Sequence, residues 1–306
     1  MLFRTESKQG VTIVLVIIKK YQNIKPVGDP GYEPKLVNVP NACDWRDASK
    51  NPEKIVAVTA VKDQGACGSC YSFSATGTME GALCLRGYQN CTTWSGLSEQ
   101  MILDCGSYSP RQYNFESEPE WYNFNGCFGG WQSNVIEFVY YNRGIMSESD
   151  YPYKSGDANA YPGSKMNVGE CQYDAAKAVG TADKHICGTT SRDGADWKSM
   201  QNAIWFKGPL AVGMYVGGSF QSYTSGVYVP QAGDCDNFES TGINHALLAV
   251  GFGEDVNANG EVTPYWIIKN SWGANWGDEG YIKVIKGVNA CGIEGNTAYT
   301  EMKPVE

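Results

Sequence analysis

The segment Q64-G-A-C-G-S-C-Y-S-F73 decides what this chain can be, because it sets two cysteines three residues apart, between a glutamine and aromatic residues. Four chemistries use such a pair: a zinc knuckle, a redox pair, half of a disulfide framework, and a nucleophile with its supporting loop. The remainder of the sequence discriminates among them.

Composition restricts the class of protein first. The chain has 306 residues, of which 42% are hydrophobic and 19% charged, so it predicts a globular protein of one large domain or two ordinary ones. The formal net charge of -9, with 24 basic against 33 acidic residues, argues against nucleic acid or an anionic membrane as a partner.

The cysteines are numerous and dispersed. Eleven in a chain of this size favour disulfides formed in an oxidising compartment. Because eleven is odd, at least one thiol is left over, and it is either accidental or reactive. Asn90-Cys91-Thr92 matches a glycosylation sequon in the same setting, although such triplets also arise by chance.

Zinc and redox chemistry are both disfavoured. A structural zinc site needs four nitrogen or sulfur ligands, but no second C-x-x-C exists, and the chain has only His185 and His245. We therefore expect no metal and no cofactor. A thioredoxin-like pair belongs in a βαβ unit of a reducing compartment, which the other cysteines argue against.

The residues after Cys70 predict a helix. Residues 71–86 contain no proline and place apolar side chains at helical spacing: Phe73, Met79, Ala82, Leu83 and Leu85. A helix that begins near Ser69 or Cys70 places the sulfur at its N-terminus. There the helix dipole favours thiolate over thiol, which is how a cysteine becomes a nucleophile.

A base and a group to orient it appear later in the chain. His245 lies in the apolar segment T241-G-I-N-H-A-L-L-A-V-G251, where a single imidazole is equally consistent with a satisfied core histidine. A second apolar segment, Y265-W-I-I-K-N-S-W-G273, ends at Asn270, which can accept the imidazole N–H, and at Trp272, which can shield the pair from water. Together with the segment from Gln64 to Phe73, these two segments indicate a cysteine nucleophile with its base far more specifically than any one of the three does alone.

With these segments the chain resembles the papain-like cysteine peptidases, whose local signature C-G-[SA]-C-[WY] is matched by C67-G-S-C-Y71. The resemblance begins at about Val39 and continues to the C-terminus. It also includes D44-W-R46, S98-E-Q100, G126-C-F-G-G130, Y151-P-Y153 and W276-G-D-E-G-Y281. His245 and Asn270 lie farther from Cys70 than the roughly 130–150 residues usual in the family, so we expect inserted loops at 106–126, 154–170 and 254–263.

The resemblance implies an α+β, two-lobed fold with a substrate cleft between the lobes. A helical lobe of about residues 48–181 would carry Cys70. A β-barrel-like lobe of about 182–297, with a strand at 39–47, would carry His245 and Asn270, and the peptidase domain would span 39–306. Apolar periodicity predicts helices at 71–86, 132–143 and 196–206, and strands at 210–216, 246–252, 265–269 and 281–285.

Residues 1–38 are expected to be an N-terminal extension, a remnant of a signal or prosegment. The apolar run V11-T-I-V-L-V-I-I18 is too short to cross a bilayer, so we expect no membrane span.

The resemblance also assigns roles. Cys70 would attack the peptide carbonyl, His245 would exchange the proton, and Asn270 would orient the imidazole, while the Gln64 amide and the Cys70 N–H would hold the oxyanion. The remaining substrate-binding positions implied by the family are Gly129, Gly130, Trp131, Gly213, Ile243, Asn244, Trp272 and Asn296. The alternative that Glu294, rather than Asn296, points into the pocket stays open.

The other cysteines are paired by resemblance. It implies the disulfides Cys67–Cys127, Cys105–Cys171 and Cys235–Cys291. Cys84 and Cys91 would close a local loop around the sequon, and Cys43 with Cys187 is a fifth pair suggested by elimination and fold analogy.

The function implied is thiol-dependent endopeptidase activity with a hydrophobic preference at the second residue before the scissile bond. An exopeptidase or a peptide ligase of the same family is the alternative, and an inactive disulfide-rich binding or storage homologue is a third. The family implies a monomer with protein or peptide substrates and inhibitors of the cystatin type. It also implies a lysosomal, vacuolar or secreted location.

Overall fold

The computed structural model describes residues 39–107, 125–182, 187–189, 197–235 and 242–305. The expected extension at 1–38 and most of the expected loop at 106–126 lie outside these residues.

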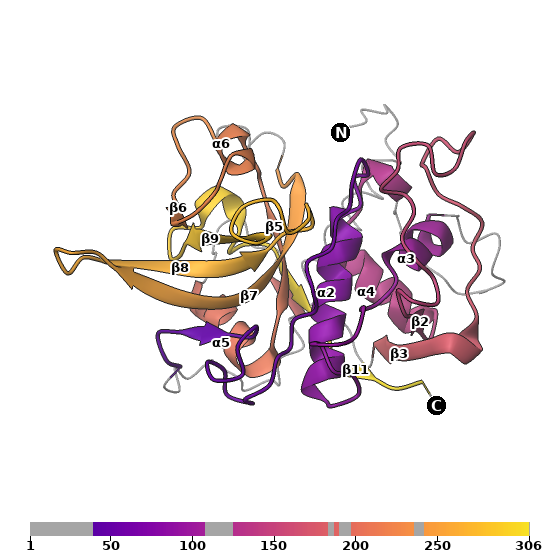
Figure 1. The fold of residues 1–306 in the computed structure, drawn as a ribbon, viewed down its shortest axis with the longest axis horizontal. Helices are drawn as coiled ribbons and strands as arrows, with labels where there is room; N and C mark the ends of the chain where they lie inside the picture. Colours follow the sequence, from indigo (N-terminus) through magenta and orange to yellow (C-terminus); the bar gives the residue numbers. More distant parts are fainter. Residues whose placement is uncertain (1–38, 108–124, 183–186, 190–196, 236–241, 306) are drawn as a thin grey trace, which may run out of the picture.

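Helices and a small sheet make up one side of the molecule (Figure 1). Its elements are α2 (Cys70–Leu85), α3 (Glu99–Gly106), η1 (Gly126–Phe128), α4 (Gln132–Tyr141), β2 (Ile145–Met146), η2 (Ala175–Lys177), β3 (Ala178–Ala182) and β11 (Met302–Lys303). The small sheet has the strand order β11-β3-β2. One hydrophobic core lies here, built around Tyr71, Met79, Leu83, Leu103 and Val135.

A larger sheet makes up the other side. Its strands are β1 (Cys43–Asp44), β4 (Cys187–Thr189), β5 (Leu210–Met214), β6 (Val227–Tyr228), β7 (His245–Val256), β8 (Val262–Lys269), β9 (Tyr281–Ile285) and β10 (Thr297–Tyr299), accompanied by α5 (Trp197–Lys207), α6 (Gly218–Gln221) and η3 (Ala290–Gly292). The strand order is β4-β10-β5-β7-β8-β9-β6, and β1 pairs with β7. Among the described residues this sheet is open, not a closed barrel, and it encloses a second core that includes Trp45, Phe220 and Trp266.

Helix α2 lies between the two sides, against β7 (Figure 1). The Ser74 hydroxyl donates to the Leu247 carbonyl at 2.6 Å, and the Thr78 hydroxyl donates to the Pro209 carbonyl at 2.7 Å. A Cβ atom at Gly77 would lie 2.8 Å from a terminal methyl group of Leu248, so a larger residue at this position would require the Leu248 side chain to shift. The close packing fixes the N-terminal end of α2 relative to the first residue of β7.

The predicted elements are confirmed with shifted ends. The predicted helix at 71–86 is α2, which begins at Cys70 as expected, and the helix at 132–143 is α4. One expectation was wrong: 254–263 is not a loop between strands. Strands β7 and β8 continue through it as a hairpin, pairing Asp255 with Thr263 and Val256 with Val262, so that only the intervening residues turn.

Four disulfides are present among the described residues: the three pairs that the resemblance implied and the local Cys84–Cys91 loop that was expected from its spacing. They are Cys67–Cys127, Cys84–Cys91, Cys105–Cys171 and Cys235–Cys291.

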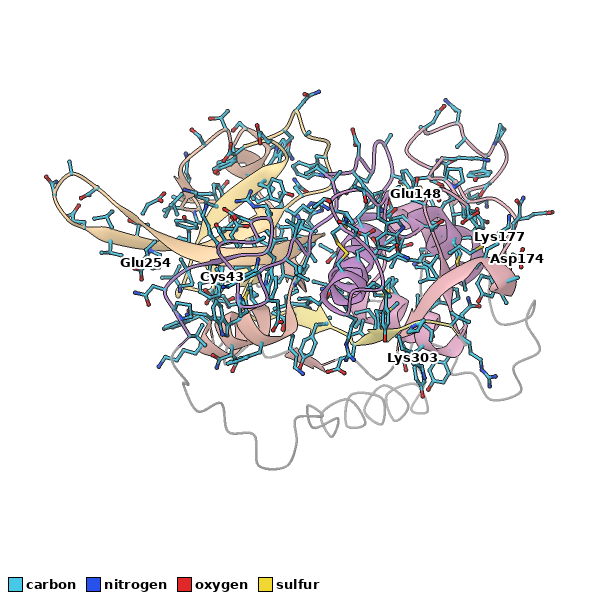
Figure 2. All side chains as sticks on the ribbon, turned by 60° about the horizontal axis from the view of Figure 1, so that its bottom comes forward. Cys43, Glu148, Asp174, Lys177, Glu254 and Lys303 are labelled. Carbon is cyan, nitrogen blue, oxygen red and sulfur yellow. A yellow bond between two sulfur atoms is a disulfide. The ribbon has the colours of Figure 1, made fainter. Side chains whose placement is uncertain are left out.

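The proposed Cys43–Cys187 disulfide was wrong, because Cys43 is a free, buried thiol. Cys43 lies in the part of the molecule that contains the large sheet (Figure 2), on β1, where it pairs with Phe252 of β7. Cys187 belongs to β4, and β10 and β5 lie between β4 and β7. Neighbouring strands are about 4.8 Å apart, so the two positions are farther apart than the ~7 Å between Cα atoms that a disulfide allows.

Candidate active site

Cys70 is the first residue of α2, and its surroundings have two opposing effects on the pKa of its thiol. Backbone hydrogen bonds from Ala246, Tyr71 and Cys70 itself lower the pKa of the thiol, but burial raises it by more, so the pKa lies above its usual value. The contact with Ala246 places the sulfur beside the start of β7, next to His245. The nucleophile and base expected from sequence are thus brought together from segments far apart in the chain.

Asn270 fixes the orientation of the His245 imidazole. His245 Nε2 lies 2.9 Å from Asn270 Oδ1, and the same oxygen accepts the N–H of Ser271 at 2.8 Å. Because Oδ1 can only accept, Nε2 carries a proton and donates it, which leaves Nδ1 as the nitrogen free to exchange a proton with a thiol. Both side chains are buried, with exposed fractions of 7% for His245 and 3% for Asn270.

Trp272 covers the imidazole as expected. Its ring centroid lies 4.9 Å from that of His245, with 32° between the planes. Trp272 is itself held edge-on by Phe220 at 5.7 Å and by Trp276 at 5.2 Å. This aromatic cluster shields the His245–Asn270 hydrogen bond from water.

Burial favours the neutral forms of both partners. It lowers the pKa of His245 to about 4, against the opposing effect of the hydrogen bond with Asn270. A lone thiolate or a lone imidazolium is therefore disfavoured here. Two opposite charges formed together in this medium of low dielectric constant would attract one another, which would offset part of the cost of burying each.

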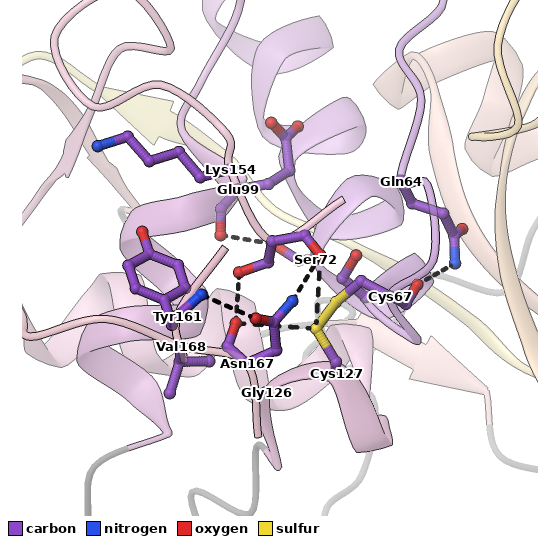
Figure 3. The surroundings of a disulfide bond; sticks show 12 residues. Gln64, Cys67, Ser72, Glu99, Gly126, Cys127, Lys154, Tyr161, Asn167 and Val168 are labelled. Carbon is purple, nitrogen blue, oxygen red and sulfur yellow. Dashed lines mark hydrogen bonds between the residues drawn. A yellow bond between two sulfur atoms is a disulfide. The ribbon is translucent and has the colours of Figure 1, made fainter. Parts of the chain in front are cut away.

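Gln64 is held against Ser271, the residue that follows Asn270. Its Nε2 donates to the Cys67 carbonyl at 2.7 Å (Figure 3), and its Oε1 accepts the Ser271 hydroxyl at 2.6 Å. Its backbone N–H donates to the Ser271 carbonyl at 2.9 Å. Among the described residues only one of the two amide protons has an acceptor, so the other can be donated to a ligand. The Cys67–Cys127 disulfide ties the same loop to η1 (Figure 3).

Ser271 is a functional candidate that sequence reasoning missed. It bonds the Gln64 side chain and the Asn270 side chain at once. The signal was its place within N270-S-W-G273, between two residues that were assigned roles.

Gly213, Ile243 and Asn296, three of the residues expected to line one pocket, lie close together. A Cβ atom at Gly213 would lie 3.0 Å from Ile243 Cδ1 and 3.0 Å from Asn296 Oδ1. Trp131 is 45% exposed, and Gln132, the next residue, donates to Asn296 Oδ1 at 2.7 Å. Gln132 was not predicted, because nothing local in the sequence indicates that the start of α4 reaches Asn296.

Glu294 does not belong to this pocket. It is 2% exposed and accepts hydrogen bonds from Trp266 Nε1 at 3.0 Å, the Gly287 N–H at 2.6 Å and the Asn289 N–H at 2.9 Å. These contacts commit both carboxylate oxygens to the loop before η3, so the alternative that Glu294 replaces Asn296 was wrong.

Gly129, Gly130 and Asn244 are the remaining positions expected to bind substrate. Gly129 has a φ of 109°, and a Cβ atom there would meet nothing within 4 Å. A Cβ atom at Gly130 would lie 2.8 Å from the Tyr71 ring. Asn244 is exposed, and its side chain accepts from the Val216 N–H at 2.7 Å and donates to the Val216 carbonyl at 3.1 Å.

Asn90 lies exposed in a turn. Its Oδ1 accepts the Thr92 hydroxyl at 2.7 Å, and Cys91 between them is held by its disulfide. Glycosylation at this position stays a prediction.

Neither a metal-binding cluster nor a membrane-spanning helix is found in the described part of the chain. In the described part of the chain, no group of three or more His, Cys, Asp or Glu side chains is arranged to hold a metal ion. None of the helices described has the length and apolarity to span a bilayer.

Residues 39–301 match the family described as papain family cysteine protease, and the chain belongs to that family. It is 35% identical to pro-cathepsin H of Bos taurus over 83% of this chain and 62% of that protein. It is 36% identical to cathepsin L1 of Drosophila melanogaster over 87% of this chain and 59% of that protein. The chain thus spans about three fifths of the length of these curated relatives.

Solved structures show the same fold. The structure of digestive procathepsin L 3 from the Tenebrio molitor larval midgut superposes with a TM-score of 0.66 and 33% identity. The match covers 87% of this chain and 71% of that one. The two-lobed papain-like fold expected from the sequence is therefore confirmed.

Proposed function

We propose that this protein hydrolyses peptide bonds through Cys70, His245 and Asn270. The observation that carries the proposal is the 2.9 Å bond between His245 Nε2 and Asn270 Oδ1, beside a cysteine that begins a buried helix. It leaves the Nδ1 atom as the only ring nitrogen able to serve the thiol. Family membership supports the same chemistry.

The steps follow from this geometry. His245 Nδ1 takes the thiol proton, and the Cys70 sulfur forms a bond to the peptide carbonyl carbon while the carbonyl electron pair moves to oxygen. The imidazolium gives its proton to the leaving amine as the C–N bond breaks, which leaves a thioester. His245 then takes a proton from water, the hydroxide adds to the thioester, and the acid product and thiol are released.

The oxyanion formed in each step needs donors. The second proton of the Gln64 amide and the Cys70 backbone N–H supply them, on a loop fixed before substrate arrives. Trp272 keeps water from the His245–Asn270 bond, so the orientation of the ring persists through the cycle.

We further propose that the enzyme is an endopeptidase and that Trp131, Gly213, Ile243 and Asn296 accept the second side chain before the scissile bond. Because Gly213 has no side chain, Ile243 and Asn296 can pack closely against it, and Ile243 and Trp131 supply apolar surface. Substrate backbone would pair with Gly129, Gly130 and Asn244. Burial of a large apolar side chain there gains on the order of 1–3 kcal/mol over alanine.

The wider setting is proposed on the same basis. The peptidase domain would span residues 39–306, after the extension at 1–38, and its lobes would span about 48–181 and 182–297. The protein would be a monomer. Protein or peptide substrates and cystatin-type inhibitors would be its partners. The disulfides support a lysosomal, vacuolar or secreted location, because such bonds persist in oxidising compartments.

End-blocked fluorogenic peptides test the proposal. We expect peptides with Leu, Phe or Tyr at the second position to be cleaved at least about tenfold faster than the Arg counterpart, because Asn296 offers no charge to a desolvated guanidinium. We expect Asn296→Asp to raise cleavage of the Arg peptide relative to Leu.

Two controls sharpen this measurement. If unblocked peptides are cleaved and end-blocked peptides are not, the enzyme is an exopeptidase instead. An Arg peptide cleaved as fast as Leu by the parent protein would rule out the assigned pocket.

A further inference from the structure

We infer that Tyr153 is a positioning residue that aligns both oxyanion donors, an inference that rests on the proposed hydrolysis at Cys70. Its hydroxyl lies 2.9 Å from the Gln64 backbone carbonyl and 2.8 Å from the Ser69 hydroxyl. A carbonyl can only accept, so the single phenol proton goes to Gln64. Ser69 must then donate its own proton to the phenol oxygen.

The two residues that Tyr153 joins are the two that carry the donors. Gln64 bears the side-chain amide, and the peptide that links Ser69 to Cys70 bears the Cys70 N–H. Ser69 is fully buried, with 0% exposure, and its side chain does not cap α2, so its hydroxyl is available to Tyr153. One hydroxyl therefore sets the separation of the two oxyanion donors.

Tyr153 is itself held rigidly. Its ring meets Phe73 of α2 edge to face, with centroids 5.0 Å apart, and its backbone N–H donates to Glu148 Oε1 at 2.8 Å. The Glu148 side chain thus orients the backbone segment that carries the Tyr153 phenol.

The following residues brace the same loop. The Gly156 carbonyl accepts the Ala66 N–H at 2.9 Å. Gly65 has a φ of +57°, and any Cβ atom there would collide with the Gly156 backbone. The segment Y151-P-Y153, noted in the sequence without a role, therefore leads into a support for the oxyanion loop.

Loss of the phenol should affect the transition state more than the bound substrate. Charge on the substrate oxygen develops only in the transition state, so misaligned donors lower kcat and leave KM nearly unchanged. We expect Tyr153→Phe, which keeps the ring against Phe73, to lower kcat about tenfold with KM within about twofold.

Two inhibitors separate this role from general damage. A peptide aldehyde adds the Cys70 sulfur to its carbonyl carbon and places the resulting oxygen between the donors. A peptide epoxide instead alkylates the Cys70 sulfur: a C–S bond forms at a ring carbon as the C–O bond breaks, and the ring oxygen takes up a proton, so no oxyanion has to be held between the donors. In Tyr153→Phe we expect aldehyde affinity to fall about tenfold and the epoxide rate at Cys70 to change less than about twofold.

Tyr151→Phe is the matched control. The Tyr151 hydroxyl donates to Asp104 Oδ2 at 2.9 Å and does not touch the oxyanion loop. We therefore expect the aldehyde affinity, the epoxide rate and kcat of this variant to stay within about twofold of those of the parent protein. Equal losses in the two variants, or equal loss of aldehyde and epoxide reactivity in Tyr153→Phe, would overturn the inference. A parent protein that hydrolyses no peptide would instead overturn the proposed function.

Discussion

Replacing Cys70 by serine should lower kcat/KM for an end-blocked peptide by about 10⁴–10⁶-fold, the range seen when a nucleophile is removed from a comparable site. The N-terminal end of α2 and the His245 imidazole favour ionisation of a thiol. A hydroxyl in the same buried position is far harder to ionise and does not form the same ion pair. Progress curves with a fluorogenic peptide, against an enzyme-free blank, measure the loss.

Cys43→Ala is the control for this change. Cys43 is a free thiol as well, and burial raises its pKa to about 12, so it should not react. Its removal should leave hydrolysis within about twofold of the parent rate. Hydrolysis that persists in Cys70→Ser, or that disappears in Cys43→Ala while the protein stays folded, would refute the assignment of the nucleophile.

Replacing Gln64 by alanine should lower kcat by about 10²–10³-fold with little change in KM, because it removes one oxyanion donor. The Ser271 hydroxyl and the Cys67 carbonyl would also lose their hydrogen bonds to the Gln64 side chain. Steady-state kinetics over a range of substrate concentrations separate kcat from KM.

A buried glutamine far from the site supplies the comparison. Gln201 lies on α5 and bonds Lys286 and the Pro40 carbonyl. Gln201→Ala should leave kcat within about twofold. If it lowers kcat as much as Gln64→Ala does, the effect of Gln64 reflects lost stability and not a donor.

The parts of the site that local chemistry dictates could be predicted from the sequence. Cys70 begins α2, and none of the sixteen residues of that helix is a proline. His245 and Asn270 were found because each lies at an end of an apolar strand, β7 or β8, and antiparallel pairing brings those ends together.

Features that depend on distant partners could not be predicted. The separation of Cys43 from Cys187 follows from the strand order, which no local pattern encodes. The hairpin beyond Glu254 was missed because its residues are polar, although cross-strand pairing and the ion pair of Lys283 with Asp255 at 3.1 Å support it. Helix α3 was missed because it is short, yet Ser98 caps it by accepting the Met101 N–H at 2.9 Å.

The pH dependence of alkylation tests the Cys70–His245 pair most directly. Native protein is treated with iodoacetamide from pH 5 to pH 8, and the modified cysteine and its rate are determined by mass spectrometry. The ion pair predicts an adduct on Cys70 that already forms rapidly at pH 5 and changes in rate by less than about tenfold over the range. A rate that climbs about tenfold per pH unit, as for a lone thiol whose pKa burial has raised, or an adduct on Cys43, would contradict it.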